Sequence, residues 1–300
     1  MAIPASRWFE DAHRVRRWTV GLLIASAIGS LALAHWWPGA QTGIAVALIL
    51  GLGLQHGALD HILHAHMHGD PEGPLRQSFA LPYVAAIGLA WFAFEWAPSI
   101  ALGLFLAASA YHFGMSHLRV DAMRHPIRPT AAAGTTLGVI VLAPLILRPD
   151  ALSVLALYDW NISLGLGGPR FPLKLASAAA ILLALVLHLQ WRTGWLPLSG
   201  VVLAWCVDDL LLAFALYFTL GHAREAFFEE FMERQSVATE FQNLYIRSLP
   251  LTSAFVLMAS AVLWAMHTGM LSERAALSFL LAGTLPHIAV LEGWVTARLR

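Results

Sequence analysis

The sequence predicts an all-α fold, a polytopic bundle of about nine or ten membrane-spanning helices. Of its 300 residues, 58% are hydrophobic and only 12% are charged, which is about half the charged share of a soluble domain. Apolar stretches of about 20 residues, the length that a helix needs to cross a bilayer, recur along the chain. In addition, many of the 14 histidines lie within or at the ends of these stretches, where ionisable residues are rare unless they have a function.

Composition also limits the possible functions. The 18 basic and 18 acidic residues balance, so there is no electrostatic argument for a nucleic-acid partner. Cys206 is the only cysteine, which excludes an internal disulfide and a cysteine-rich metal site. Because no linker or low-complexity segment interrupts the chain, we expect residues 1–300 to form one integral membrane domain.

The predicted spans follow from the apolar stretches. They are 18–37, 41–63, 78–97, 99–118, 130–148, 172–190, 198–222, 249–268 and 276–297. The first is interpreted as a membrane helix, because more spans and no persuasive cleavage site follow it. A shorter apolar piece at 151–168 contains Asp159 and Asn161, and is either a tilted span or a re-entrant helix.

Loop charge favours ten crossings with a cytoplasmic amino terminus. If 151–168 crosses, all the arginine-rich loops lie on the cytoplasmic side of the cell membrane, as the positive-inside rule expects. The charged and aromatic stretch 223–248 is predicted to be an interfacial cytoplasmic helix.

Histidines on four separate spans predict a metal site. His56 lies near the end of the second span, His112 near the end of the fourth, His222 at the end of 198–222, and His287 in the last span. In the topology above these four spans all run toward the cytoplasm, so the four side chains can converge in the cytoplasmic half of the membrane. Neutral imidazole suits iron, zinc, copper and nickel, so the ligand type leaves the metal open.

Two neighbours of His56 are expected around the metal. Asp60 lies on the same helix face as His56, because residues i and i+4 are neighbours on a helix, and a carboxylate commonly orients a ligand histidine. His61 is the other expected neighbour. His64, His66 and His68 are interpreted as a solvated loop end.

Aromatic residues on or beside the same spans predict, more weakly, a hydrophobic substrate tunnel. The ordinary alternative is helix packing. The four residues that we select as substrate-binding candidates are Trp91, Tyr111, Phe113 and Tyr217.

The motifs HGALDH at 56–61, YHFG at 111–114, the segment around His222 and the Pro-His pair at 286–287 resemble the Brp/Blh family of membrane β-carotene 15,15′-dioxygenases. The resemblance implies cleavage of the central double bond of β-carotene by molecular oxygen to give retinal. It also implies a non-haem iron (Fe²⁺) held by histidines, with His56, His112 and His222 as catalytic residues. The expected partners are a carotenoid drawn from the bilayer, oxygen, lipid and a retinal-accepting opsin.

The third motif departs from the family pattern. That motif resembles H-x-x-x-H, but Ala226 stands where the second histidine would be. A fourth ligand would then come from elsewhere, with His287 as first candidate. The others are His117, His61 and Glu225.

Three other functions remain open. A membrane di-iron desaturase or hydroxylase also uses many histidines, although its boxes contain an HH pair, and the sequence has none. A metal or proton transporter could use HILHAHMHGD as a metal-gathering loop. A non-catalytic carotenoid- or retinal-binding protein is the third.

Overall fold

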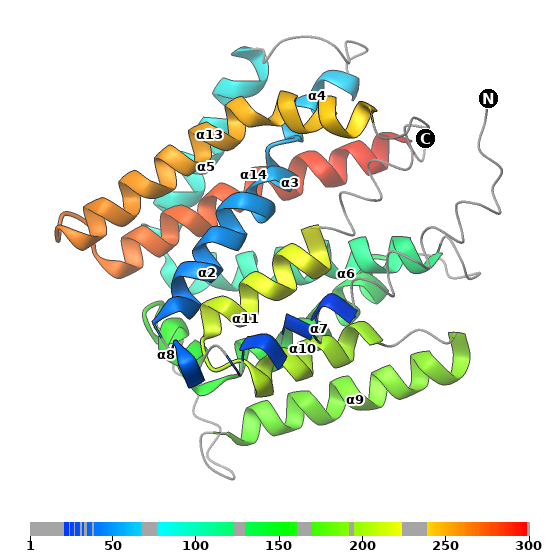
Figure 1. Ribbon diagram of the computed structural model, residues 1–300. Coiled ribbons are helices and arrows are strands. Elements are labelled where there is room, and N and C mark those ends of the chain that lie inside the picture. Colours follow the sequence, from blue (N-terminus) through cyan, green and yellow to red (C-terminus); the bar gives the residue numbers. More distant parts are fainter. Residues whose placement is uncertain are drawn as a thin grey trace. The chain divides into compact units, whose positions relative to one another are not determined.

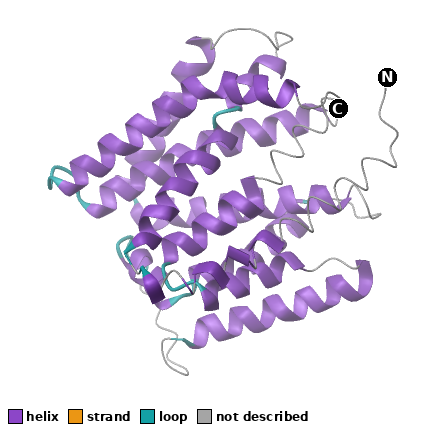
Figure 2. Ribbon diagram, in the orientation of Figure 1, coloured by secondary structure: helices purple, strands orange, loops and turns teal. Residues whose placement is uncertain are grey.

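The computed structural model describes most of the chain. The described residues are 21–23, 25–26, 28–30, 32, 35–37, 39–67, 77–122, 130–160, 170–191, 195–223 and 239–298. Within these ranges the regular elements are all helices, joined by short turns, and there is no strand (Figure 2). The prediction of an all-α fold is confirmed.

The chain folds into two compact units, each built from three stretches. Unit 1 comprises Met1–Gly53, Ala110–Ala156 and Trp160–Val237, and unit 2 comprises Leu54–Ser109, Leu157–Asp159 and Ala238–Arg300. Residues 224–238, most of the predicted interfacial helix, lie outside the described residues. That helix and the single-domain organisation therefore stay predictions.

Among the described residues, four helices are long and apolar enough to cross a membrane. They are α5 (Gln77–Trp96), α6 (Pro98–Ala122), α13 (Thr239–His267) and α14 (Glu273–Arg298). They correspond to the predicted spans 78–97, 99–118, 249–268 and 276–297. A fifth candidate is the pair α7 (Ala131–Ile146) and α8 (Pro149–Ala156), which is bent by 98°. The long apolar helices indicate a multi-pass membrane protein, while the total number of crossings and their orientation stay predictions.

Unit 1 packs helices around a core of apolar side chains. Besides α7 it contains α2 (Ala40–Leu48), the π-helix η1 (Ile49–Gly53), α9 (Phe171–Trp191), α10 (Trp195–Cys206), α11 (Leu210–Leu216) and the π-helix η2 (Tyr217–Ala223). Helices α7, α9 and α10 pack against one another and α11 packs against α2 (Figure 1). Leu203, Leu212 and Tyr217 are fully buried in this core.

The predicted span 198–222 is wrong as a single helix. The structure ends α10 at Cys206 and starts α11 at Leu210. Arg148 donates to the carbonyl oxygens of Val207 and Asp208, each at 2.5 Å. Asp209 then caps α11 by accepting a hydrogen bond from the backbone N–H of Leu212 at 2.8 Å, as N-cap residues do. Arg148 therefore stabilises the break, because its guanidinium donates hydrogen bonds to carbonyl groups that have no partner within a helix.

The predicted span 41–63 is also divided. It runs through α2 and η1 into α3 (Leu54–Gly57), turns at Ala58 and Leu59, and resumes as α4 (Asp60–Met67). In unit 2, α14 packs against α5 and α4, and α13 packs against α14 and α3. Asp60 therefore begins a new helix, where a negative charge interacts favourably with the helix dipole.

Glycines let α6 and α7 approach closely in unit 1. A Cβ on Gly114 would collide with the carbonyl oxygen of Gly134, and one on Gly138 would collide with that of Ala110. Small residues at such contacts allow close backbone approach in membrane helices. The glycine of the YHFG motif thus fixes the position of the helix that carries His112.

We predict that Gly138→Ala lowers the free energy of unfolding by roughly 1–3 kcal/mol, because the added methyl group meets backbone that cannot rotate away. Gly88→Ala in α5 is the matched control, since nothing lies within 4 Å of a Cβ at that position. Thermal denaturation of the purified protein in detergent measures both. Equal stability of the two variants would contradict the close packing of α6 on α7.

Candidate metal centre

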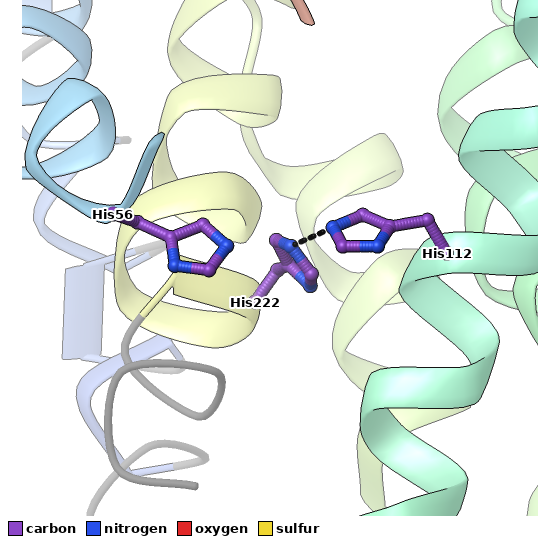
Figure 3. Close-up of side chains that lie close together, drawn as sticks. All are labelled: His56, His112 and His222. Atoms are coloured by element: carbon purple, nitrogen blue, oxygen red, sulfur yellow. Dashed lines mark hydrogen bonds between the residues drawn. The ribbon is translucent and has the colours of Figure 1, made fainter. Parts of the chain in front are cut away.

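Two of the predicted histidines form a buried pair in unit 1. His112 lies on α6 and His222 on η2, with 1% and 0% of their surface exposed. Their Nε2 atoms are 3.1 Å apart, and their rings meet edge to face (Figure 3). Two ring nitrogens at this distance share either a proton or a cation, because two bare lone pairs would repel.

Stacked rings hold His222 in place. The ring of Phe218 stacks on His222 with centroids 6.0 Å apart, and Phe214 stacks on Phe218 at 5.7 Å. The π-helix η1 contacts η2, and a Cβ on Gly53 would collide with the Phe218 ring. Both segments are π-helices, a form that is often found at functional sites. The absence of a side chain at Gly53 therefore lets the aromatic stack reach His222.

Further aromatic and polar groups surround the unit 1 pair. The Phe113 ring centroid lies 4.2 Å from that of His222. His117 is fully buried, and its Nε2 lies 2.9 Å from the hydroxyl of Tyr217. Tyr111 is partly buried against the core of unit 1. Phe113 and Tyr217 thus lie in the packed surroundings of His222, and substrate contact by the three aromatic residues stays a prediction.

The other two predicted histidines form a similar pair in unit 2. His56 on α3 is 2% exposed, and its Nε2 lies 3.0 Å from that of His287 on α14. The rings again meet edge to face, with centroids 4.5 Å apart. A Cβ on Gly57 would sit 3.7 Å from the His287 ring. The Gly of HGALDH thus lies directly against His287.

Asp60 fixes the tautomer of His287. The carboxylate is fully buried, with Oδ1 2.8 Å from Nδ1 of His287, and its Oδ2 accepts a hydrogen bond from the hydroxyl of Tyr83 at 2.8 Å. An ionised carboxylate only accepts hydrogen bonds, so Nδ1 of His287 carries the proton. In the neutral form of the ring the lone pair then lies on Nε2, which faces His56. This carboxylate–histidine arrangement is the one that commonly supports a metal-bound imidazole.

Other predicted residues lie elsewhere. Nδ1 of His61 is 2.8 Å from the carbonyl oxygen of Ala58 on its own chain segment, and the ring of His64 packs against Phe79. Trp91 packs edge to face on Phe279. The roles predicted for His61 and Trp91 stay predictions. Glu225 and Ala226 lie outside the described residues.

Tyr83 is the site residue that sequence reasoning missed. It stands in an apolar run of α5, 23 residues from Asp60, and no helical spacing links the two. The only signal is that a tyrosine hydroxyl buried in a bilayer-spanning helix needs a polar partner.

The donors of each pair fit a metal ion. Nitrogens bound about 2.0–2.1 Å from one ion lie about 2.9 Å apart when the bonds meet at a right angle, and about 3.4 Å apart in a tetrahedron. The observed separations of 3.0 and 3.1 Å fall within that range. All four donors are imidazoles, a set that suits iron as well as zinc, copper and nickel.

Comparison with known proteins assigns a family. A family model described as β-carotene 15,15′-dioxygenase matches residues 47–295. The chain belongs to the β-carotene 15,15′-dioxygenase family. The predicted resemblance is confirmed, and a dioxygenase-type function on a carotenoid is supported. The matched residues include all four histidines of the two pairs. No curated protein and no solved structure matches the chain.

In this β-carotene dioxygenase family member, we predict that Gly53→Ala lowers the free energy of unfolding by roughly 1–3 kcal/mol, because Phe218 is held between two rings and cannot yield. Gly51→Ala, in the same π-helix, is the matched control, since nothing lies within 4 Å of its Cβ position. Chemical denaturation followed by tryptophan fluorescence compares them. Gly53→Ala as stable as Gly51→Ala would show that η1 does not support the stack.

Proposed function

We propose that this protein cleaves the central double bond of β-carotene, or of a related carotenoid, with molecular oxygen to give retinal. The proposed centre is one iron(II) ion held by His56, His112, His222 and His287. The observation that carries the proposal is the presence of two histidine pairs with facing Nε2 atoms in a member of this family.

A shared ion is favoured over two separate ions by the number of donors. Each pair alone offers two imidazoles, fewer than the three or four protein ligands that metal sites of this kind use. An ion shared by His56, His112 and His222 would have three imidazole ligands. His287 would be the fourth ligand, because its Nε2 already faces His56 and because Ala226 offers no donor.

The protein's own residues would supply binding, orientation and exclusion of water. When bound, iron(II) supplies the redox chemistry with oxygen that imidazoles and aromatic rings lack. The four imidazoles would leave room for a further ligand, and the buried rings around His222 would keep water out. The polyene would enter from the bilayer and be held with one double bond beside the ion, so that positioning makes the main contribution.

The remaining partners also follow from this proposal. The substrate would come from the lipid, and retinal would return to the lipid or pass to an opsin. The cell membrane would be the site of action, with the amino terminus on the cytoplasmic side.

We predict that His56→Ala, His112→Ala and His222→Ala each lose bound iron and retinal formation, by more than the roughly 10–100-fold that loss of an outer-shell partner costs. The matched control is His267→Ala, because His267 is exposed at the end of α13. The measurements are elemental analysis and retinal chromatography with β-carotene, with and without oxygen.

The outcomes separate the alternatives. One iron per chain with oxygen-dependent retinal supports the proposal, whereas two irons favour a di-iron desaturase or hydroxylase. If the protein binds iron but does not cleave β-carotene, β-carotene is excluded as the substrate. Transport of a metal ion into liposomes, with no oxygen uptake, would replace the enzyme with a transporter.

A further inference from the structure

The Asp60 carboxylate has a second partner besides His287. It is fully buried in unit 2, and both of its oxygens are used, Oδ1 by Nδ1 of His287 and Oδ2 by the hydroxyl of Tyr83, each at 2.8 Å. A buried charge without full hydrogen bonding is costly. The Tyr83 hydroxyl therefore supplies one of the two side-chain hydrogen bonds that stabilise the buried Asp60 carboxylate.

We propose that Tyr83 is a positioning residue: its hydroxyl orients the Asp60 carboxylate, which holds the His287 imidazole with Nε2 directed at the metal. This inference rests on the proposed function, in which His287 is an iron ligand. It adds a residue that touches neither metal nor substrate.

Two hydrogen bonds define the carboxylate plane. A carboxylate held at one oxygen can turn about its terminal torsion, which is broad and soft. A second bond at the other oxygen, from a group on another helix, removes that freedom. Asp60 begins α4, Tyr83 is on α5 and His287 is on α14, so the chain of bonds joins three helices of one unit.

The backbone of α5 and α14 makes these side-chain bonds more important. Pro82 directly precedes Tyr83, and Pro286 directly precedes His287, both inside helices. Each proline removes one backbone hydrogen bond of its helix, which is where helices bend. The bonds to Asp60 hold the side chain of the residue that follows each proline.

The ring of Tyr83 is held independently of its hydroxyl. It packs against Phe79 with centroids 5.1 Å apart, and against Phe255 at 6.3 Å. Tyr83→Phe can keep these contacts and remove only the donor to Asp60. Tyr158→Phe is the matched control in the same unit, because Tyr158 is also buried, and its hydroxyl accepts a bond from Ser278 at 3.3 Å and donates one to the carbonyl oxygen of Arg274 at 3.5 Å.

We predict that Tyr83→Phe weakens Co²⁺ binding to the full-length protein about tenfold, within the 10–100-fold cost of changing an outer partner. Tyr158→Phe should bind Co²⁺ like the unsubstituted protein. Titration of the metal-free protein in detergent, followed by the visible absorption of bound Co²⁺, measures affinity and geometry together. The Tyr83→Phe spectrum should also shift, because the His287 ring is less well oriented.

A double-mutant cycle tests the route of the effect. Asp60→Asn should weaken Co²⁺ binding at least as much as Tyr83→Phe, and adding Tyr83→Phe to Asp60→Asn should weaken it no further, because residues in one network are not additive. Additive losses would overturn the proposed route. Adding Co²⁺ should raise the melting temperature less in Tyr83→Phe than in the unsubstituted protein. In Tyr158→Phe the rise should be unchanged.

The remaining outcomes distinguish this inference from the proposed function. Normal Co²⁺ affinity and spectrum in Tyr83→Phe, with binding lost in His56→Ala, would overturn the role of Tyr83 and leave the metal centre intact. No Co²⁺ binding by the unsubstituted protein would overturn both.

Discussion

The structure depends on a single requirement: imidazole rings buried among apolar helices need partners for their polar nitrogens. In unit 2 this requirement is met by a chain of bonds that runs from Tyr83 through Asp60 to His287. In unit 1 the Nε2 atoms of His112 and His222 face each other at 3.1 Å, and Nε2 of His117 lies 2.9 Å from the hydroxyl of Tyr217. An unsatisfied polar group in such an interior costs about 1–3 kcal/mol, so each histidine pair constrains the helices that carry it.

Sequence reasoning succeeded where one physical quantity decides the outcome. The apolar length of 78–97 and 249–268 is enough to predict long helices, because the bilayer fixes that length. It failed between Val207 and Asp209, where apolar residues continue on both sides of a break. There the decisive group is the Arg148 guanidinium, 59 residues away from Val207, and no local pattern reveals a donor so distant in sequence.

The same distinction applies to the site. Histidines inside apolar stretches are conspicuous, so His56, His112, His222 and His287 could all be selected before their pairing was known. The sequence could not predict which histidine faces which, because the pairing depends on how separate helices pack. Tyr83 was missed for the same reason, since one tyrosine in an apolar helix differs little from its neighbours until the carboxylate beside it is known.

The proposed centre does not need a donor at position 226. A metal requires donors at suitable distances and is indifferent to which helix supplies them. In the proposed centre His287 would offer a lone pair on Nε2, because Asp60 holds the proton on Nδ1, and α14 would supply the donor that Ala226 does not. Such a replacement needs a carboxylate in an apolar interior, and that carboxylate in turn needs Tyr83. The hydrogen bonds through Asp60 therefore link the orientation of the His287 ring to Tyr83.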